Sequence, residues 1–464
     1  MPNENHFLHA LLWSPLCLLV IAANMSGTVS AAVAGKEESR PSSAYFWQQM
    51  TASAAWPARS MHAAVSFRDE LWVLGGGIDR YSSESVNDVW SSTDGIDWVE
   101  RTAHAAWTSR MAHSAAVFRE KVWIMGGLSL ASDVGDVWWS DDGIAWTGVP
   151  QESPWTERSS PTAVSEGGIL YLLGGLHRGT TLADVWQTAN GSDWTCLAPQ
   201  APWSSRAGFQ SVLFSGGLWI LGGVHTDTPT GTAECLNDVW TSPDGAVWTP
   251  AMLHAAWRGR DFHAAVAFDR KIWVLGGEYV EGTGHAATTC VLNDVWYSED
   301  GTDWHQAPNA PWAARSRPAA VTFGGKLWVL GGKTIVNDDF MLLNDVWSLT
   351  PVPLSIESEH ASPYHVGETL TLRVLGPGLP PGVTYQWKKD GAALPGETTD
   401  TYRVTAVAEA ASGSYTCEIG GSAFGTAGPT VIAVNPAPQV PLGTPALTGA
   451  AVGLLIVGIR SLRR

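Results

Sequence analysis

The sequence predicts an all-β protein. A six-bladed β-propeller, closed by an N-terminal strand, is followed along the chain by a smaller β-sandwich. One repeated feature predicts the propeller: six times along the chain, a Gly-Gly pair at the end of an apolar segment is followed by an Asp-Val-Trp tripeptide. Their spacing of about 50 residues suits one propeller blade per repeat. After Pro353 this pattern gives way to alternating strands, which predicts the second domain. The pairs begin at Gly75, Gly126, Gly174, Gly222, Gly276 and Gly331, and the tripeptides at Asp88, Asp136, Asp184, Asp238, Asp294 and Asp345.

The second repeat shows how each blade is expected to form. Short apolar segments at 113–118 and 121–127 predict its first two strands, and 136–140 the third. A hairpin turn of the Asp-Gly kind at Asp142-Gly143 leads into a fourth strand that begins at Ile144. Short strands separated by turn residues, without helical periodicity, indicate a four-stranded antiparallel sheet.

The sixth repeat lacks its fourth strand, and the missing strand is predicted at the start of the propeller. Trp47 precedes Trp56 by nine residues, as Trp98 precedes Trp107 at the end of the first repeat. Residues 45–50 should therefore form the fourth strand of the last blade. Such a strand closes the ring and removes its exposed sheet edges.

The repeats resemble kelch repeats over residues 45–350, through Gly-Gly after an apolar strand, a spaced aromatic residue, and Trp before an Arg segment. The resemblance implies a propeller that serves as a binding module. Galactose oxidase shares this repeat, but its copper ligands have no counterpart at corresponding places here. We therefore expect no cofactor and no metal site.

Composition and motifs favour binding over catalysis. The net charge of −17 argues against a nucleic-acid partner, which would require a basic surface. The sequence contains no HExxH, GxSxG or Walker A motif, so we expect no catalytic residues and no enzyme activity. All but three of the 26 Trp occupy repeated positions, so the Trp content by itself does not indicate sugar binding.

Both ends of the chain carry sorting features. Residues 1–34 predict a secretory signal peptide, with an apolar stretch before Ala32-Val33-Ala34; an uncleaved anchor is the alternative. Residues 436–464 form a Pro-rich linker, an apolar run and a basic tail, and resemble bacterial exosortase-type sorting signals. A plain transmembrane tail anchor is the alternative. Either way we expect an exported protein of a bacterial cell envelope, with the membrane as one partner.

Residues 352–435 resemble an immunoglobulin-like domain. Trp387 would be the buried Trp of strand C, and Tyr415, two residues before Cys417, the tyrosine corner. Val374 takes the position of the usual first Cys, so this domain should have no internal disulfide.

The most variable segments lie between Gly-Gly and Asp-Val-Trp, on the face that also carries the links between blades. Function tends to reside on such loops, and we expect a protein or glycan ligand here; tolerated insertion is the alternative. The candidate binding residues are His177, Arg178, His225, Asp227, Glu278, Tyr279, Glu281 and His285.

Three further repeated features have two interpretations each. The Arg before each first strand is either a structural hydrogen-bond donor or part of a cationic ring at the channel mouth. His62, His113 and His263 share a position that Pro and Phe fill elsewhere, so packing is favoured over metal binding. Cys235 and Cys290 occupy similar positions in consecutive repeats, and either form a disulfide or remain thiols.

The function expected from the sequence is a cell-surface module that binds or adheres through the loop face of the propeller. Two alternatives stay open: an extracellular glycan-acting enzyme with its site on that face, and a purely structural surface component. A cluster of perturbed ionisable groups in a central pocket would favour the enzyme.

Overall fold

The computed structural model describes residues 42–80, 83–130, 132–150, 152–226, 233–282 and 288–436 of the chain. In these residues the regular elements are β-strands, apart from one short 3₁₀ turn at Glu409–Ala411. The predicted all-β class is confirmed. The signal peptide and the C-terminal sorting segment lie outside the described residues, apart from Pro436 at the start of the linker.

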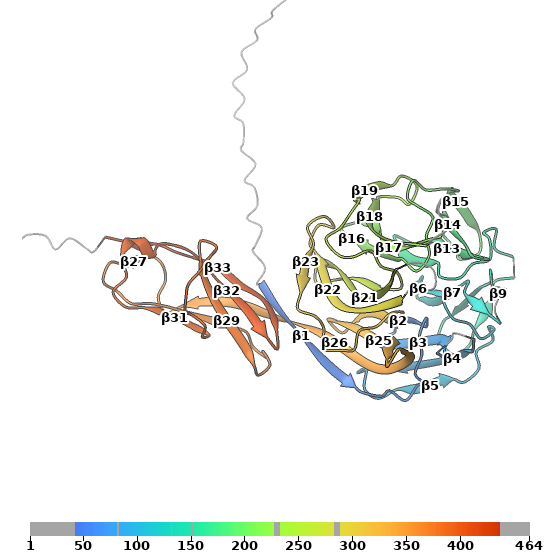
Figure 1. Cartoon of the computed structure of the whole chain (residues 1–464), viewed down its shortest axis with the longest axis horizontal. Coiled ribbons are helices and arrows are strands. Elements are labelled where there is room, and N and C mark those ends of the chain that lie inside the picture. The colour runs from blue at the N-terminus through green and yellow to red at the C-terminus, as the bar shows by residue number, and fades with distance from the viewer. Residues whose placement is uncertain are drawn as a thin grey trace, which may run out of the picture. The chain divides into compact units, whose positions relative to one another are not determined.

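Five four-stranded antiparallel sheets stand alone and form most of a propeller (Figure 1). Each sheet corresponds to one sequence repeat, and its four strands lie side by side in chain order. The first is β2 (Ala63–Phe67), β3 (Glu70–Gly77), β4 (Ser85–Ser92) and β5 (Val99–Thr102). The second is β6 (Ser114–Phe118), β7 (Lys121–Met125), β10 (Val137–Ser140) and β11 (Thr147–Gly148), with a small hairpin of β8 (Leu128–Ser129) and β9 (Ser132–Asp133). The third is β12 (Thr162–Glu166), β13 (Ile169–His177), β14 (Thr180–Thr188) and β15 (Trp194–Ala198). The fourth is β16 (Gln210–Phe214), β17 (Gly217–His225), β18 (Glu234–Ser242) and β19 (Thr249–Met252). The fifth is β20 (Ala264–Phe268), β21 (Lys271–Glu281), β22 (Thr288–Ser298) and β23 (His305–Ala307).

The prediction of six separate blades is wrong: five sheets are separate, and the sixth repeat belongs to a larger sheet. Its strands β24 (Ala319–Phe323), β25 (Lys326–Val336) and β26 (Asp339–Ser358) pair in order with β1 (Ser42–Thr51). The other edge of β1 pairs with β33 (Phe424–Ile432) of the second domain, and β26 itself runs on into that domain. The sixth repeat therefore shares a ten-stranded sheet with the sandwich.

The predicted closing strand is confirmed. β1 is antiparallel to β26, with Trp47 opposite Leu349 and Phe46 opposite Thr350. It extends a few residues beyond the predicted 45–50, because its first residues follow β26 out of the propeller toward the second domain. The N-terminal strand thus completes the strand set of the last repeat.

A series of backbone hydrogen bonds links consecutive repeats around the central channel. The residue two positions after each repeated Arg has a positive φ, and in five of the six repeats its N–H donates to the matching carbonyl of the preceding repeat. The last bond, Met61 to Arg317 (3.2 Å), joins the first repeat to the sixth. The others are Ala112 to Met61 (2.8 Å), Ser160 to Ala112 (2.7 Å), Phe262 to Gly208 (2.7 Å) and Arg317 to Phe262 (2.8 Å).

The repeated Arg is structural. Arg59 is fully buried and holds both carboxylate oxygens of Asp88 (2.7 and 2.8 Å) as well as the carbonyl of Gly75 (2.8 Å). The other five Arg make the same three bonds within their own repeats. Each Arg therefore ties the second strand to the third, and the alternative of a cationic ring is overturned.

Tryptophan pairs and the histidines pack within and between repeats. Trp56 lies edge-on to Trp98 at 5.9 Å, and five more such pairs repeat this geometry, including Trp47 with Trp312. His62 is buried 5.9 Å from Trp56, and His113 and His263 occupy matching places. The packing interpretation of these histidines is confirmed.

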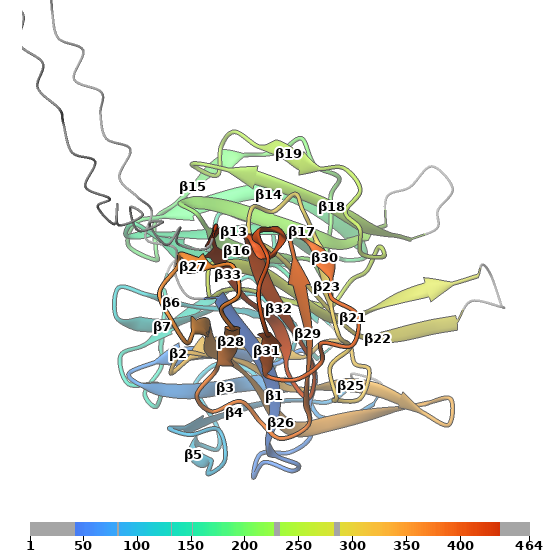
Figure 2. The same cartoon turned by 90° about the vertical axis from the view of Figure 1, so that its left-hand side faces the viewer.

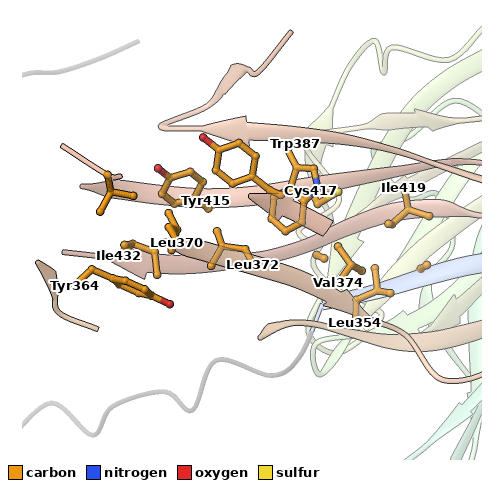
Figure 3. Close-up of a cluster of buried hydrophobic side chains, with 14 of the residues drawn as sticks. Leu354, Tyr364, Leu370, Leu372, Val374, Trp387, Tyr415, Cys417, Ile419 and Ile432 are labelled. Atoms are coloured by element: carbon orange, nitrogen blue, oxygen red, sulfur yellow. The ribbon is translucent and has the colours of Figure 1, made fainter. Parts of the chain in front are cut away.

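The second domain is a β-sandwich around one apolar core (Figure 3). Trp387 and Cys417 are opposite one another on neighbouring strands, both fully buried, with Val374 close to the same core. The Tyr415 hydroxyl donates to the carbonyl of Ala411 at 2.7 Å, as predicted for a tyrosine corner. Its remaining strands are β27 (Tyr364–His365), β28 (Leu370–Leu375), β29 (Val383–Lys389), β30 (Ala392–Ala393), β31 (Thr401–Val404), β32 (Gly413–Gly421) and β34 (Val434–Asn435).

Candidate functional site

Strand order places two kinds of loop on one face of the propeller. The second strand of each sheet runs toward this face and the third runs away from it, so the loop after Gly-Gly lies here, and so does the link into the next repeat. We call this the loop face. The hairpins β21–β22 and β25–β26 extend beyond the other strands of the propeller (Figure 2).

Charged residues collect at one part of the loop face. In every repeat, the residue after the repeated Arg pairs with the residue after Gly-Gly. In the first four repeats both positions hold uncharged residues: Ser60 with Gly77, Met111 with Leu128, Ser159 with Leu176, and Ala207 with Val224. In the fifth, Asp261 is opposite Glu278, and in the sixth Ser316 is opposite Lys333. Asp261, Glu278, Lys333 and the neighbouring Arg317 form what we call the rim cluster.

The rim cluster is buried and partly hydrogen-bonded. Glu278 accepts from Arg317 Nη2 at 2.9 Å and from the Ser316 hydroxyl at 2.7 Å. The Arg317 guanidinium lies 4.4 Å from the Phe262 ring centre, and the Lys333 ammonium 3.8 Å from that of Phe340. Aromatic faces therefore hold both cations.

Asp261 has weaker support. Its carboxylate is buried beside that of Glu278, and among the described residues its side chain accepts one hydrogen bond, from the Cys235 thiol at 3.9 Å. Burial, together with the charge of Glu278, raises the pKa of Asp261 to about 7, and Arg317 only partly opposes this. Burial and Arg317 lower the pKa of Lys333 to about 8, against the opposing effect of Glu278. Two groups of the rim cluster, which share Glu278 and Arg317 as neighbours, thus change protonation near neutral pH, which is typical of functional sites.

The raised pKa of Asp261 predicts a pH-dependent stability. An unfolded Asp has a pKa of about 3.9, so between about pH 4 and pH 7 the folded chain holds a proton that the unfolded chain has lost. Stability should therefore fall as pH rises through this window. Asp261→Asn should remove the loss and leave the variant more stable at pH 8 by on the order of 2 kcal/mol.

Urea unfolding at pH 5 and pH 8 measures this difference in the free energy of unfolding. Asp97→Asn, at an exposed carboxylate, is the matched control and should unfold like the unmodified chain. Equal pH dependence in Asp261→Asn and the unmodified chain would contradict the assignment.

The channel beside the rim cluster is narrow. At its mouth, Phe262, His263 and Arg317 are among the residues that line a cavity of about 100 Å³. A second cavity of about 230 Å³ lies along the first strands of the sheets and is bordered mainly by Ala, Ser and Thr. Pockets for organic ligands usually measure 300–1,000 Å³. A large partner would therefore contact the loop face rather than enter the channel.

Two of the predicted binding residues play the same structural part in consecutive repeats. His177 Nδ1 lies 2.7 Å from the Glu157 carbonyl, and His225 Nδ1 lies 2.7 Å from the Ser205 carbonyl. Arg178 is exposed, 4.0 Å from the Glu157 carboxylate. These contacts attach the tips of the hairpins to the link before each Arg.

The predicted residues of the fifth repeat separate into two groups. Glu278 belongs to the rim cluster, whereas Tyr279 and Glu281 lie farther along β21 and contact Arg258. The Arg258 guanidinium is 3.7 Å from the Tyr279 ring centre and 3.7 Å from Glu281. Asp227 and His285 lie outside the described residues.

The disulfide expected as one alternative for Cys235 and Cys290 does not form, and both are free thiols. They belong to different sheets, where Cys235 is opposite Val224 and Cys290 is opposite Tyr279. The Cys235 thiol points to Asp261, and burial with this neighbouring carboxylate raises its pKa to about 12. The two cysteines thus occupy similar positions in consecutive repeats but have different neighbours.

Asp261, Arg317 and Lys333 were not predicted as site residues. A signal for them was present, because these positions can be aligned across the six repeats and become charged only in the last two. The sequence does not show which of these residues face each other. That depends on the bridge between the residue after each Arg and the residue after each Gly-Gly pair.

The described residues contain neither a metal-binding cluster nor a membrane-spanning helix. In those ranges, no three His, Cys, Asp or Glu side chains gather closely enough to hold a metal ion. The same part of the chain has no helix of the length and apolarity needed to cross a membrane.

Comparison with known proteins supports the fold at a coarse level. Residues 353–430 match the immunoglobulin domain family. No curated protein matches the sequence. A solved structure described as "Structure of YjhT" covers 65% of this chain and 99% of its own, with a TM-score of 0.53 and 13% identity, so the likeness concerns the fold alone. The chain therefore combines a propeller arrangement, with five separate sheets, and an immunoglobulin-like domain.

Proposed function

We propose that this protein is a binding module whose partner is another protein, held by the loop face at the fifth and sixth repeats. The observation that carries the proposal is the position of the long hairpins β21–β22 and β25–β26 beside the rim cluster. Apolar side chains are exposed on these hairpins: Val280, Val336 and Met341 are 55%, 45% and 47% exposed. Exposed apolar residues beside charged groups are the usual make-up of a protein-binding surface.

Three further features complete the proposal. The repeats are kelch repeats, by the motifs they carry. The protein is exported through residues 1–34 and is attached to a bacterial envelope through residues 436–464. The immunoglobulin-like domain then serves as a spacer between the attachment and the propeller.

A charge scan of the two propeller faces tests the binding surface. Val280→Asp, Val336→Asp and Met341→Asp place carboxylates on the loop face. Ile96→Asp, Ile144→Asp and Val247→Asp place them at turns of the opposite face, where exposure is similar, at 45–62%. We expect each loop-face change to weaken binding by about tenfold or more, because a buried carboxylate in an interface loses its hydration.

Protein and glycan arrays probed with the purified full-length chain supply the partner for this scan. Loss of binding in the loop-face variants alone supports the proposal. Equal loss in both sets, or binding to no array member, would count against it. Binding to glycans only would assign the surface to a glycan partner instead.

A glycan-acting enzyme is the second candidate, and one observation favours it. Asp261 and Glu278 are neighbouring carboxyl groups, and the raised pKa of Asp261 keeps one of them protonated near neutral pH. Such a pair suits general acid–base catalysis. Release of reducing ends from glycans by the unmodified chain, lost in Asp261→Asn and kept in Asp97→Asn, would establish this function over binding.

A further inference from the structure

The junction between the second and third repeats of the propeller contains a cavity. Its volume is about 370 Å³, within the range of pockets that bind organic ligands. Gly135 and Asp136 border it from the second repeat, and Glu152, Ser153 and Glu157 from the link into the third. It lies apart from the rim cluster, so a ligand site here is independent of the proposed function.

At four other junctions an Asn closes the corresponding space. In the first repeat, Asn87 Nδ2 donates to the carbonyls of Ala105 and Trp107, both at 2.9 Å, and the Asn87 carbonyl accepts from Ala105 N–H at 3.0 Å. Asn237 and Asn344 make the corresponding side-chain and backbone bonds, and Asn293 makes the backbone bond and the side-chain bond to the Ala310 carbonyl. The third repeat has Ala183 at this position and keeps the backbone bond, from Ala201 N–H at 2.8 Å.

The second repeat has neither contact. Its residue at this position is Gly135, which has no side chain to donate. Ser153 takes the place of Ala105, two residues before the Trp, and within the described ranges no hydrogen bond joins it to Gly135. The second repeat is therefore the one among these six junctions where the described residues show neither the Asn side chain nor the backbone hydrogen bond.

The opening exposes a carboxylate that is covered elsewhere. The Asp136 side chain is 41% exposed, whereas the matching Asp of the other five Arg–Asp pairs is 10–16% exposed. Asp136 is already neutralised by Arg110. The unpaired charge comes from Glu152, which has no hydrogen bond or ion pair in the described chain, whereas Glu157 has one long ion pair, 4.0 Å from the exposed Arg178.

Apart from Gly135 and Ser153, the rest of the wall is apolar. Val149, Pro150 and the indole of Trp155 line the cavity beside these carboxylates. A ligand that suits both the acidic and the apolar part of the wall carries a cationic group on an apolar stem. The cationic group would face Glu152 and Glu157. Because no three candidate ligand side chains meet in the described residues, an inorganic divalent ion is not the match.

We propose that this cavity binds an ammonium or guanidinium group carried on an aliphatic stem. Such a group can come from a Lys or Arg side chain of a partner polypeptide or from a free alkylamine. The two sources share the chemistry that the cavity recognises, and the experiment separates them.

The test is calorimetric titration of the full-length chain with four probes. End-blocked Gly-Lys-Gly and Gly-Arg-Gly represent the polypeptide source, pentylammonium represents the free amine, and end-blocked Gly-Gln-Gly is the uncharged control. We expect saturable binding of at least one cationic probe, no binding of the Gln peptide, and weaker binding at high salt. Binding of the peptides alone or of pentylammonium alone identifies the source.

Gly135→Asn is the decisive variant. A Cβ at this position would meet the nearest atom, of Glu157, at 3.4 Å, which is ordinary contact, and the backbone there does not require glycine. The added amide should restore the bonds of the other junctions and close the cavity, with at least a tenfold loss of affinity and an unchanged or higher melting temperature. Glu152→Gln should weaken binding about threefold to tenfold, whereas Glu166→Gln, at an exposed residue outside the cavity, should not.

Two results would overturn the proposal. One is absence of saturable binding for all three cationic probes at low salt. The other is binding that Gly135→Asn leaves unchanged while its thermal unfolding shows an intact fold.

Discussion

A chain that lacks β1, Ser42–Thr51, is expected to lose cooperative unfolding of the propeller altogether. β1 pairs with β26 along most of its length, so its removal leaves an unpaired edge in the strand set of the last repeat. The cost should be comparable to the whole stability of a domain, about 5–15 kcal/mol.

Side chains of β1 explain why the loss should spread beyond one sheet. Tyr45 is buried against Trp273 at 5.1 Å, and its hydroxyl donates to Asp269 at 2.5 Å, both in the fifth repeat. Trp47 lies edge-on to Trp312 at 5.8 Å. In other repeats the second-strand aromatic packs under the Asp-Gly or Asn-Gly turn of the next repeat, as Trp72 does at Gly143. The sixth repeat has no such turn, and Tyr45 covers Trp273 in its place.

Near-ultraviolet circular dichroism during heating measures this effect, because the Trp pairs dominate that signal. The control is a chain that begins at Ser42, which keeps β1 and should melt in one sharp transition. A chain without β1 that melts as sharply and at the same temperature would show that the ring closes without this strand.

The sequence predicted the parts of the fold that recur. Strand type and the closing strand both follow from repeated spacing, since six copies average out local variation. The number of separate sheets did not follow from it. That number depends on β1 and β26 pairing with strands of the second domain, and the sequence holds no repeat from which such pairing could be read.

The candidate site was less predictable for a different reason. Unusual loop length directed the prediction of function to Glu278, Tyr279 and Glu281. The charged residues opposite Glu278 and beside it occupy regular positions of the repeat and differ from their counterparts only in residue type. Gly135 is a similar case, since the cavity beside it lies where both the Asn side chain and the backbone hydrogen bond are missing, and loop length does not reveal it.

Removal of a single carboxylate from a buried Arg–Asp pair should have the largest effect of any one substitution in the propeller. In the fifth repeat, Asp294→Ala leaves Arg260 fully buried without its counter-charge. Breaking such a pair typically costs about 3–5 kcal/mol, because the remaining charge cannot be hydrated. The hydrogen bond from Arg260 to the neutral carbonyl of Gly276 would not replace the carboxylate.

The second repeat supplies a matched control within the same chain. Asp136→Ala removes the equivalent partner of Arg110, but the open junction exposes Asp136, so water can reach the site. We expect this variant to lose roughly 1–2 kcal/mol, nearer to the cost of a partly exposed charged hydrogen bond. Urea unfolding of both variants at neutral pH gives the comparison, and equal losses would contradict the role assigned to burial.

Acid provides an independent measure of the same pairs. Burial would raise the pKa of Asp294, but the hydrogen bonds and charge of Arg260 outweigh burial and hold this pKa below its ordinary value; Asp136 is affected in the same way by Arg110. A carboxyl with a depressed pKa stabilises the fold above its unfolded pKa of about 3.9 and loses that contribution as pH falls through the folded pKa. The unmodified chain should therefore lose stability below about pH 4, and Asp294→Ala, already without this carboxylate, should lose less over the same interval. If the variant and the unmodified chain have equal free energies of unfolding in acid but not at neutral pH, the effect comes from an ion pair. A difference in the free energy of unfolding that is the same at every pH would assign the effect to packing.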